Sequence, residues 1–215
     1  PVYLYEAAAF DAARRALPAV RAGEYEGLTE KLARPGWTPD FGPARPHPSF
    51  GAAIVGARSF LVAWNVSLST SDVDVARRIA GRVRTSGTVS RTADGHTVRL
   101  PGRLAAVRAV GWGMPSYGHA QVSLNLLDIQ TTPMHEAYDA VAEEAAREGH
   151  RVIGSELIGL VPLDALRAAG RDALGEACTI ASDDDLVTAA VARLGLNAVH
   201  AFDPGTRLLE YALRR

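Results

Sequence analysis

The apolar positions of this chain change their spacing along the sequence, from strand-like runs to helix-like stripes. Residues 59–66 are β-branched and aromatic without strict alternation, which predicts a strand buried on both faces. Residues 71–84 carry an apolar stripe at Val75, Ile79 and Val83, behind a Ser-Asp pair that can cap a helix. The pattern therefore predicts a strand followed by an amphipathic helix.

Further strands and helices follow in the pattern. Residues 88–100 alternate around Asp94-Gly95, a strong short-range signal for a β-hairpin. A helix over 133–148 is expected to begin at a Thr132 cap, with Pro133 at its first position. The other predicted strands lie at 2–5, 104–111, 120–128, 152–158 and 207–212, and the other predicted helices at 7–16, 25–33, after Pro162 and at 183–194.

From residue 59 onward the predicted order is β-α-hairpin-β-β-α-β, with extra helices and a last strand. This order is typical of a ferredoxin-like α-β plait, an antiparallel or mixed sheet covered by helices on one face. The sequence therefore predicts an α+β fold.

A loop rich in proline and glycine precedes this region, at residues 42–51 with the sequence GPARPHPSFG. Its three prolines fix φ and remove backbone donors, which excludes the interior of a helix or strand. The loop offers a guanidinium, an imidazole, a hydroxyl, an aromatic face and some free amides, a set that suits a flat, polar, anionic ligand. The alternative is a Pro-rich connector between two subdomains.

Composition narrows the possible functions. The chain has 215 residues, 47% hydrophobic and 22% charged, with a formal net charge of −1, which argues against broad electrostatic binding to nucleic acid or to membranes. Cys178 is the only cysteine, so no internal disulfide forms, and the six histidines lack the spacing of a zinc site. No apolar run approaches the length of a membrane span, and no signal-type hydrophobic segment is evident at the N-terminus. We therefore expect a cytoplasmic protein, and we expect no bound metal.

Distinctive sequence blocks are spread over nearly the whole chain. They are PVYLY (1–5), LPAVRAGEYEGL (17–28), PDFGP (39–43), GARSFLVAWNVSL (56–68), GW (111–112), AQVSLNLLD (120–128), TPMH (132–135), GSELIGLVPLDAL (154–166) and RLLEY (207–211). In content and order these blocks resemble the formiminotransferase family, the glutamate formimidoyltransferases that act on tetrahydrofolate.

The resemblance implies an enzyme of histidine degradation that moves a formimino group between formiminoglutamate and tetrahydrofolate, its co-substrate, without a metal. It implies a homodimer, with residues 1–58 as the end of the N-terminal subdomain and residues 59–215 as the C-terminal, plait-like subdomain. In the family the catalytic histidine lies further upstream, in a segment like GEHPRMGALD that these residues lack. The isolated chain is therefore expected to be inactive. The sequence does not distinguish a formimino from a formyl donor.

The lack of the segment with the catalytic histidine also allows an alternative. In this alternative the chain is a non-catalytic folate-binding or interaction module, whose N-terminal subdomain is missing or separately encoded. The resemblance places folate binding in the proline-rich loop, at Gly42, Pro43, Ala44, Arg45, Pro46, His47, Pro48, Ser49, Phe50 and Gly51. Further substrate contacts are expected at Arg21, Arg58, Gln121, Ser123, Asn125 and Glu156.

Alternative roles remain for several of these polar residues. Gln121, Ser123 and Asn125 alternate along one predicted strand and so share a face. Their side chains could form hydrogen bonds with a pterin, or the face could be exposed to solvent. Glu156 could bind substrate or pair with an arginine. Arg21 could instead pair with its neighbours and fix a subdomain junction.

Overall fold

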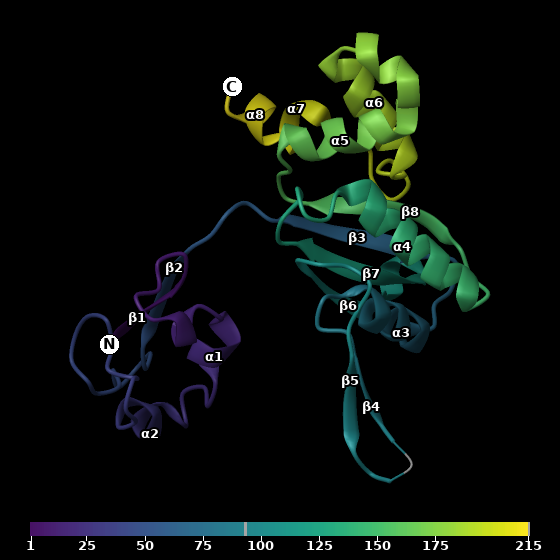
Figure 1. The fold of residues 1–215 in the computed structure, drawn as a ribbon. Helices are drawn as coiled ribbons and strands as arrows, with labels where there is room; N and C mark the ends of the chain where they lie inside the picture. The colour runs from purple at the N-terminus through teal and green to yellow at the C-terminus, as the bar shows by residue number, and fades with distance from the viewer. Residues whose placement is uncertain (93, 215) are drawn as a thin grey trace. The chain divides into compact units, whose positions relative to one another are not determined.

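A computed structural model describes residues 1–92 and 94–214 (Figure 1). Its mixture of helices and sheets confirms the predicted α+β class. The chain divides into two compact units, Pro1–Ser59 and Phe60–Arg215, which we call unit 1 and unit 2. Each unit has its own strands and its own buried apolar cluster.

Unit 1 is built on two parallel strands from opposite ends of its sequence. β1 (Val2–Glu6) pairs with β2 (Ala53–Ala57) in parallel register. β2 has no counterpart among the predicted strands, because four of its five residues are exposed and give no burial pattern. The connection between the strands carries η1 (Ala12–Arg14), α1 (Leu17–Arg21) and α2 (Leu28–Leu32).

The helix predicted over residues 7–16 is wrong. Only the 3-10 turn η1 forms there, behind Asp11, whose carboxylate accepts a hydrogen bond from the Ala13 amide at 2.9 Å. An α-helix begins only at Leu17, because Pro18 suits the first turn, where no N–H is needed and its fixed φ favours helix entry. Pro18, which follows the range predicted as helix, therefore lies in the first turn of the helix that forms.

Buried polar anchors hold unit 1 together. Arg14 and Asp40 form an ion pair with an Nη2–Oδ1 distance of 3.0 Å, and the Asp40 side chain is only 2% exposed. The other Asp40 oxygen accepts a hydrogen bond from the Leu4 amide at 2.7 Å. The Tyr3 hydroxyl donates to the Trp37 carbonyl at 2.5 Å. These bonds fix β1 against the segment that leads into the proline-rich loop.

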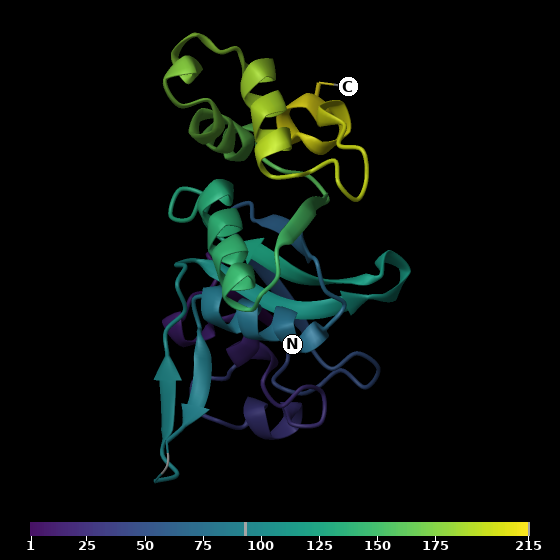
Figure 2. The same ribbon diagram turned by 90° about the vertical axis from the view of Figure 1, so that its right-hand side faces the viewer.

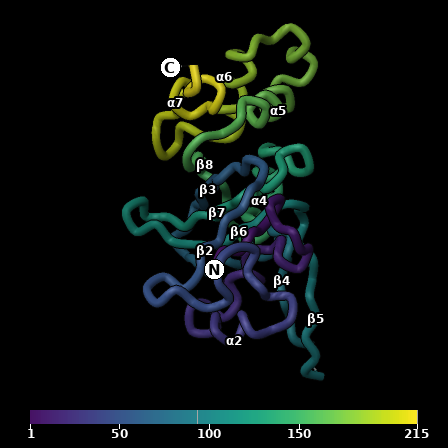
Figure 3. The backbone as a smooth tube through the Cα atoms, turned by 90° about the vertical axis from the view of Figure 1, so that its left-hand side faces the viewer, coloured from purple at the N-terminus to yellow at the C-terminus, as the bar shows by residue number. Residues whose placement is uncertain are grey.

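Unit 2 contains a four-stranded sheet whose neighbouring strands are all antiparallel. The strand order is β6-β7-β3-β8, and the labels follow one another in this order in Figure 3. The element order around the sheet is β-α-hairpin-β-β-α-β, the order expected from the sequence. The strands are β3 (Val62–Leu68), β6 (Val107–Met114), β7 (His119–Leu126) and β8 (Val152–Ile158).

One face of this sheet is apolar and covered by helices. Trp64 lies opposite Leu124 and Leu157 in neighbouring strands, and the side chains of Trp64 and Leu124 are almost fully buried. α3 (Val73–Val83) and α4 (Met134–Arg147) pack on the sheet and against each other (Figures 1 and 2). The burial of this face accounts for most of the apolar core of unit 2.

The two covering helices begin differently. Asp72 caps α3 as predicted, since its carboxylate accepts a hydrogen bond from the Asp74 amide at 2.8 Å. The Thr132 cap predicted for α4 is wrong, because the Thr132 hydroxyl donates to the Ala105 carbonyl at 2.7 Å instead. Pro133 occupies the cap position of α4 and makes no side-chain bond.

An ion-pair network joins the solvent sides of these helices. Arg78 donates to Glu148 from Nε and Nη2, at 3.1 and 2.8 Å, and Arg82 donates to the other oxygen at 2.7 Å. The hydrogen bonds from Arg78 and Arg82 lower the pKa of Glu148 to about 2. The network therefore ties the end of α4 to α3 as long as Glu148 is ionised.

The predicted hairpin forms as β4 (Thr88–Arg91) and β5 (Thr97–Leu100), which project away from the sheet in Figure 1. Gly95 of the predicted Asp-Gly turn has a φ of +83°, a conformation that glycine adopts without strain. Residue 93, which the predicted hairpin also spans, lies outside the described residues.

The C-terminal part of unit 2 is helical, and the last predicted strand, over residues 207–212, is wrong. Leu208 makes a single parallel bridge with Val161, and the next residues form a helical turn. Short apolar runs such as this one do not distinguish helix from strand by their spacing. The remaining helices are η2 (Pro115–Tyr117), α5 (Leu163–Leu174), η3 (Gly175–Ile180), α6 (Asp183–Arg193), α7 (Pro204–Arg207) and α8 (Leu209–Ala212).

Candidate functional site

The proline-rich loop closes on itself at its C-terminal end. His47 and Gly51 exchange two backbone hydrogen bonds of 2.7 and 2.9 Å, and the Ser49 amide donates to His47 Nδ1 at 3.2 Å. Gly51 has a φ of +73°, and a Cβ there would lie 2.8 Å from the Tyr25 ring, so the position requires glycine. Three amides that were expected to be free are thus used inside the loop.

Other groups of the loop remain available. The Phe50 ring stacks on the His47 ring, with centroids 3.8 Å apart and an angle of 18° between the planes. Phe50 is nevertheless 60% exposed, which leaves ring surface open to a ligand. Within the described residues, the amides of Ala44, Arg45 and Phe50 have no acceptor, and the Arg45 guanidinium has no partner.

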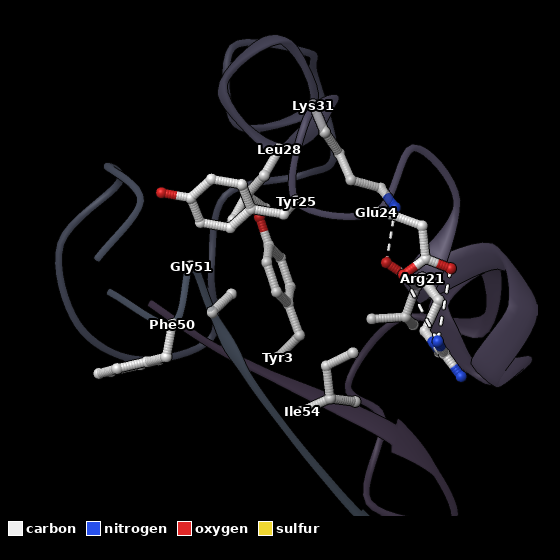
Figure 4. A pocket seen from close by; sticks show the side chains of 11 residues that line it. Tyr3, Arg21, Glu24, Tyr25, Leu28, Lys31, Phe50, Gly51 and Ile54 are labelled. Atoms are coloured by element: carbon white, nitrogen blue, oxygen red, sulfur yellow. Dashed lines mark hydrogen bonds and ion pairs between the residues drawn. The ribbon is translucent and has the colours of Figure 1, made fainter. Parts of the chain in front are cut away.

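A pocket of about 210 Å³ lies beside the end of this loop, within unit 1. The Tyr25 hydroxyl donates to the Pro48 carbonyl at 3.0 Å, which attaches the loop to the pocket wall. The predicted residues Arg21, Phe50 and Gly51 thus come together at one pocket. Figure 4 shows its lining, which comprises Tyr3, Val20, Arg21, Glu24, Tyr25, Leu28, Lys31, Phe50, Gly51, Ala52 and Ile54.

Arg21 is paired within this pocket, as the alternative from the sequence allowed. Its Nη2 lies 3.4 Å from both carboxylate oxygens of Glu24, and both side chains are more than half exposed. An exposed pair at this distance contributes roughly 0–1 kcal/mol. Arg21 can therefore exchange Glu24 for the carboxylate of a ligand at little cost.

Lys31 is a residue of this pocket that the sequence analysis missed. Its ammonium donates to the carbonyls of Ala19, Val20 and Ala22, at 2.9, 2.6 and 2.8 Å. It also lies 4.2 Å from the centre of the Trp37 ring. Burial lowers the pKa of Lys31, while the carbonyls and the ring stabilise its charge. The signal available in the sequence was that Lys31 is the only lysine of the chain.

The second candidate region is the sheet face of unit 2 that the covering helices leave uncovered. Gln121, Ser123 and Asn125 share this face as predicted, because their neighbours on β7 point into the core. Gln121 is buried, Ser123 half-buried and Asn125 exposed. Glu156 on β8 joins them, since Gln121 Nε2 donates to Glu156 Oε1 at 3.1 Å. Two predicted contacts are therefore direct neighbours.

This polar face also includes residues that the sequence did not predict as site residues. Asn65 Nδ2 donates to Glu156 Oε1 at 3.3 Å, and Gln121 Nε2 also donates to the Ser67 hydroxyl at 3.1 Å. Gln121 Oε1 is buried without a hydrogen-bond partner among the described residues. An unsatisfied buried acceptor is disfavoured in a purely structural role, so it marks this face as a candidate site.

The polar face continues into a group of rings at one end of the sheet. His119 Nε2 lies 3.0 Å from the Ser67 hydroxyl, and the Tyr117 hydroxyl lies 2.9 Å from His200 Nε2. His200 Nε2 is in turn 4.0 Å from Glu156 Oε2. No local spacing in the sequence predicts this group, because Ser67, Glu156 and His200 lie far from Tyr117 and His119 along the chain.

Two predicted contacts remain to be placed, and only the alternative of an arginine partner for Glu156 is contradicted. Glu156 does not pair with an arginine in the described part of the chain, since its bonds go to amides. Arg58 is exposed beyond the end of β2 and has no partner there. Across residues 1–92 and 94–214, no group of three His, Cys, Asp or Glu side chains could hold a metal ion. None of the described helices is long and apolar enough to span a membrane.

Comparison with known proteins gives the family. Residues 63–214 match the formiminotransferase domain, and residues 1–58 match its N-terminal subdomain. The chain is 42% identical over 215 residues to formimidoyltransferase-cyclodeaminase from Gallus gallus, an alignment that covers 100% of the chain and 38% of that protein. It is 44% identical over 212 residues to the same enzyme from Rattus norvegicus, covering 98% of the chain and 38% of the relative.

A shorter relative is also similar. Over 166 residues the chain is 38% identical to glutamate formimidoyltransferase from Streptococcus pyogenes serotype M1, which covers 77% of the chain and 51% of that protein. The chain thus spans between 38% and 51% of the length of these relatives. The matches run through both units and leave few residues unaligned to the family. The chain therefore belongs to the formiminotransferase family.

Proposed function

We propose that this chain takes part in the folate-dependent transfer of a formimino group between formiminoglutamate and tetrahydrofolate in histidine degradation. Family membership supports the proposal, because relatives are formimidoyltransferases by name. The observation that carries it is the loop at residues 42–51, held beside a pocket with an exposed ring and an unpaired arginine.

The proposed reaction exchanges one nitrogen for another on the formimino carbon. The bond from this carbon to the glutamate nitrogen breaks as a bond to N5 of tetrahydrofolate forms. The proton released from N5 replaces the carbon on the glutamate nitrogen, so no oxidant or reductant is needed. A general acid or base near the nitrogens would move this proton. We assign that role to no residue of this chain.

The loop is proposed to bind folate through its open groups. Phe50 would stack on the pterin or on the aromatic ring next to it. The free amides of Ala44 and Arg45 would donate to ring heteroatoms, and the Arg45 guanidinium would pair with a carboxylate of the glutamate tail. Arg21, with its weakly held Glu24 partner, is proposed as a second carboxylate contact.

The organisation proposed for the protein follows the family. Residues 1–58 would be the end of the N-terminal subdomain and residues 59–215 the C-terminal subdomain of a cytoplasmic homodimer. We propose that these 215 residues bind folate but transfer the formimino group little or not at all by themselves. A folate-binding module without catalysis remains the second reading of the same residues.

Calorimetric titration with tetrahydrofolate tests the role of the loop. We expect the chain to bind it, and Phe50→Ala to weaken binding about tenfold, the equivalent of about 1.4 kcal/mol of lost ring contact. Arg45→Met is expected to weaken the binding of a folate that carries several glutamates more than the binding of a folate that carries one.

Phe10→Ala is the matched control, because Phe10 is a more exposed phenylalanine of unit 1 that lies outside the loop and the pocket. It should bind tetrahydrofolate like the wild type. Absence of binding by the wild-type chain would contradict the proposed function. Binding that is equal in the wild type and in Phe50→Ala would contradict only the role of the loop.

A further inference from the structure

A second pocket lies entirely within unit 2, where the end of β8 meets the segment between α6 and α8. Its volume is about 150 Å³. It is distinct from the proline-rich loop and shares Glu156 with the polar sheet face. Its lining includes Glu156, Ile158, Leu196, His200, Phe202 and Arg207.

The Glu156 carboxylate is only half satisfied. Its Oε1 accepts hydrogen bonds from Gln121 at 3.1 Å and Asn65 at 3.3 Å. Its Oε2 accepts none from the described residues, and His200 Nε2 lies at 4.0 Å. The Glu156 side chain is 11% exposed. A carboxylate so far removed from water is unfavourable unless it is paired, so Oε2 is suited to a cationic or N–H donor group of a ligand.

The same pocket contains a cation without a counter-ion. The half-buried Arg207 donates from Nη1 to the Gly159 carbonyl at 3.4 Å, and it forms no ion pair with the described carboxylates. A single long bond to a neutral carbonyl leaves most of the guanidinium donors free. The pocket thus presents a carboxylate oxygen without a hydrogen bond, with His200 Nε2 at 4.0 Å, and a cation without a counter-ion.

We propose that this pocket binds the amino-acid side of the reaction. The nitrogen of glutamate, as an ammonium or as the formamidinium of formiminoglutamate, binds Glu156 Oε2, and a carboxylate of the same molecule binds Arg207. Ile158, Leu196 and Phe202 contact the methylene groups between them. This assignment rests on the proposed function for the identity of the amino acid.

The charges favour an amino acid over the other substrate. A pterin edge carries neutral N–H donors, which could satisfy Glu156 but would leave Arg207 without an anion. An amino acid neutralises both residues at once, and two charge-assisted hydrogen bonds are stronger than two neutral ones. The size of the pocket also fits a small molecule better than a whole folate.

Ligand-detected NMR on the 215-residue chain tests the proposal, with L-glutamate and with glutarate, which lacks the nitrogen. We expect L-glutamate to bind at least tenfold more tightly than glutarate. Glu156→Gln keeps an oxygen for Asn65 and Gln121 but loses the charge, so it should abolish this preference. Arg207→Met should weaken the binding of both ligands, because both carry carboxylates.

Glu136→Gln is the matched control, since it removes the same charge from an exposed position of α4 outside the pocket. It should retain the preference for L-glutamate. Circular dichroism should show that Glu156→Gln is folded, and Glu156→Asp should recover part of the preference. Equal binding of the two ligands by the wild type, or an unchanged preference in Glu156→Gln, would overturn the proposal.

A titration of the same variants with tetrahydrofolate separates this proposal from the proposed function. If Glu156→Gln weakens the binding of tetrahydrofolate and not that of L-glutamate, Glu156 belongs to a pterin site and the proposal is overturned. If the wild type binds L-glutamate through Glu156 but does not bind tetrahydrofolate, the amino-acid pocket stands and the folate function fails.

Discussion

The two units keep their structure by different means. Unit 1 buries a small apolar cluster of Tyr3, Val20 and Leu28, and it relies on a buried ion pair and on Lys31. Unit 2 buries a much larger cluster between its sheet and the helices that cover it. Polar anchors are directional and specify geometry, whereas apolar burial supplies most of the free energy of folding. The comparison indicates that the loop in unit 1 is positioned mainly by hydrogen bonds.

The largest expected effect is in unit 1. Asp40→Ala removes the partner of Arg14 and the acceptor of the Leu4 amide, and it leaves a buried cation unpaired. We expect unit 1 to lose about 3–5 kcal/mol of stability. Native-state hydrogen exchange should show faster exchange in β1 and β2 and unchanged exchange in β3 and β7.

Glu26→Ala is the control, because it removes an exposed carboxylate of the same unit. It should leave exchange unchanged. If Asp40→Ala accelerates exchange equally in both units, the distinction between a polar-anchored and an apolar unit is incorrect.

The next effect is in unit 2. Leu124→Ala leaves a cavity under Trp64 and the covering helices, and we expect the free energy of unfolding of unit 2 to fall by about 2–5 kcal/mol. Denaturation in urea, followed by tryptophan fluorescence, measures this change. Val110→Ala on the opposite face, where Val110 is 58% exposed, should cost less than about 0.5 kcal/mol. Similar losses from the two substitutions would contradict the assignment of the core face.

The smallest effect concerns the surface of unit 2. Glu148 has its pKa lowered from 4.5 to about 2, first by its hydrogen bond with Arg78 and then by Arg82. A lowered folded-state pKa contributes stability above the unfolded value, and this contribution is lost as the pH falls through the folded value. Because the arginines are exposed, we expect Glu148→Gln to cost no more than about 1 kcal/mol at pH 7.

The pH dependence identifies the source of this effect. The difference in urea midpoint between wild type and Glu148→Gln should shrink from pH 4.5 toward pH 2. Glu176→Gln, at an exposed position of η3, should show no such dependence. A difference that persists below pH 2 would assign the effect to packing instead of charge.

The sequence predicted unit 2 better than unit 1 for a physical reason. The apolar stripe of α3 repeats with the helical period, and β3 is a continuous apolar run typical of a strand buried on both faces, so the pattern indicates the structure. In unit 1, β2 is mostly exposed and α1 begins at a proline, so neither leaves such a pattern. Structure that depends on single hydrogen bonds, such as those of Asp40, cannot be read from periodicity.

The candidate sites show the same limit. Alternation along β7 correctly placed Gln121 and Ser123 on one face, because strand geometry fixes which residues share a side. The approach of Glu156 to Gln121 depends on the register of β8 against β3, which no local pattern specifies. Glu156 and Arg207 line the same pocket because the chain near Arg207 returns to the end of β8, where Leu208 bridges to Val161.

Lys31 has a practical consequence for chemical labelling. It is the only lysine, so an acylating reagent that modifies a side-chain amine of this chain can react only there. In the folded state its nitrogen is enclosed by three carbonyls and the Trp37 ring, which should block the reagent. Modification at this one amine would therefore report the opening of unit 1, and the modification rate would measure how often unit 1 opens.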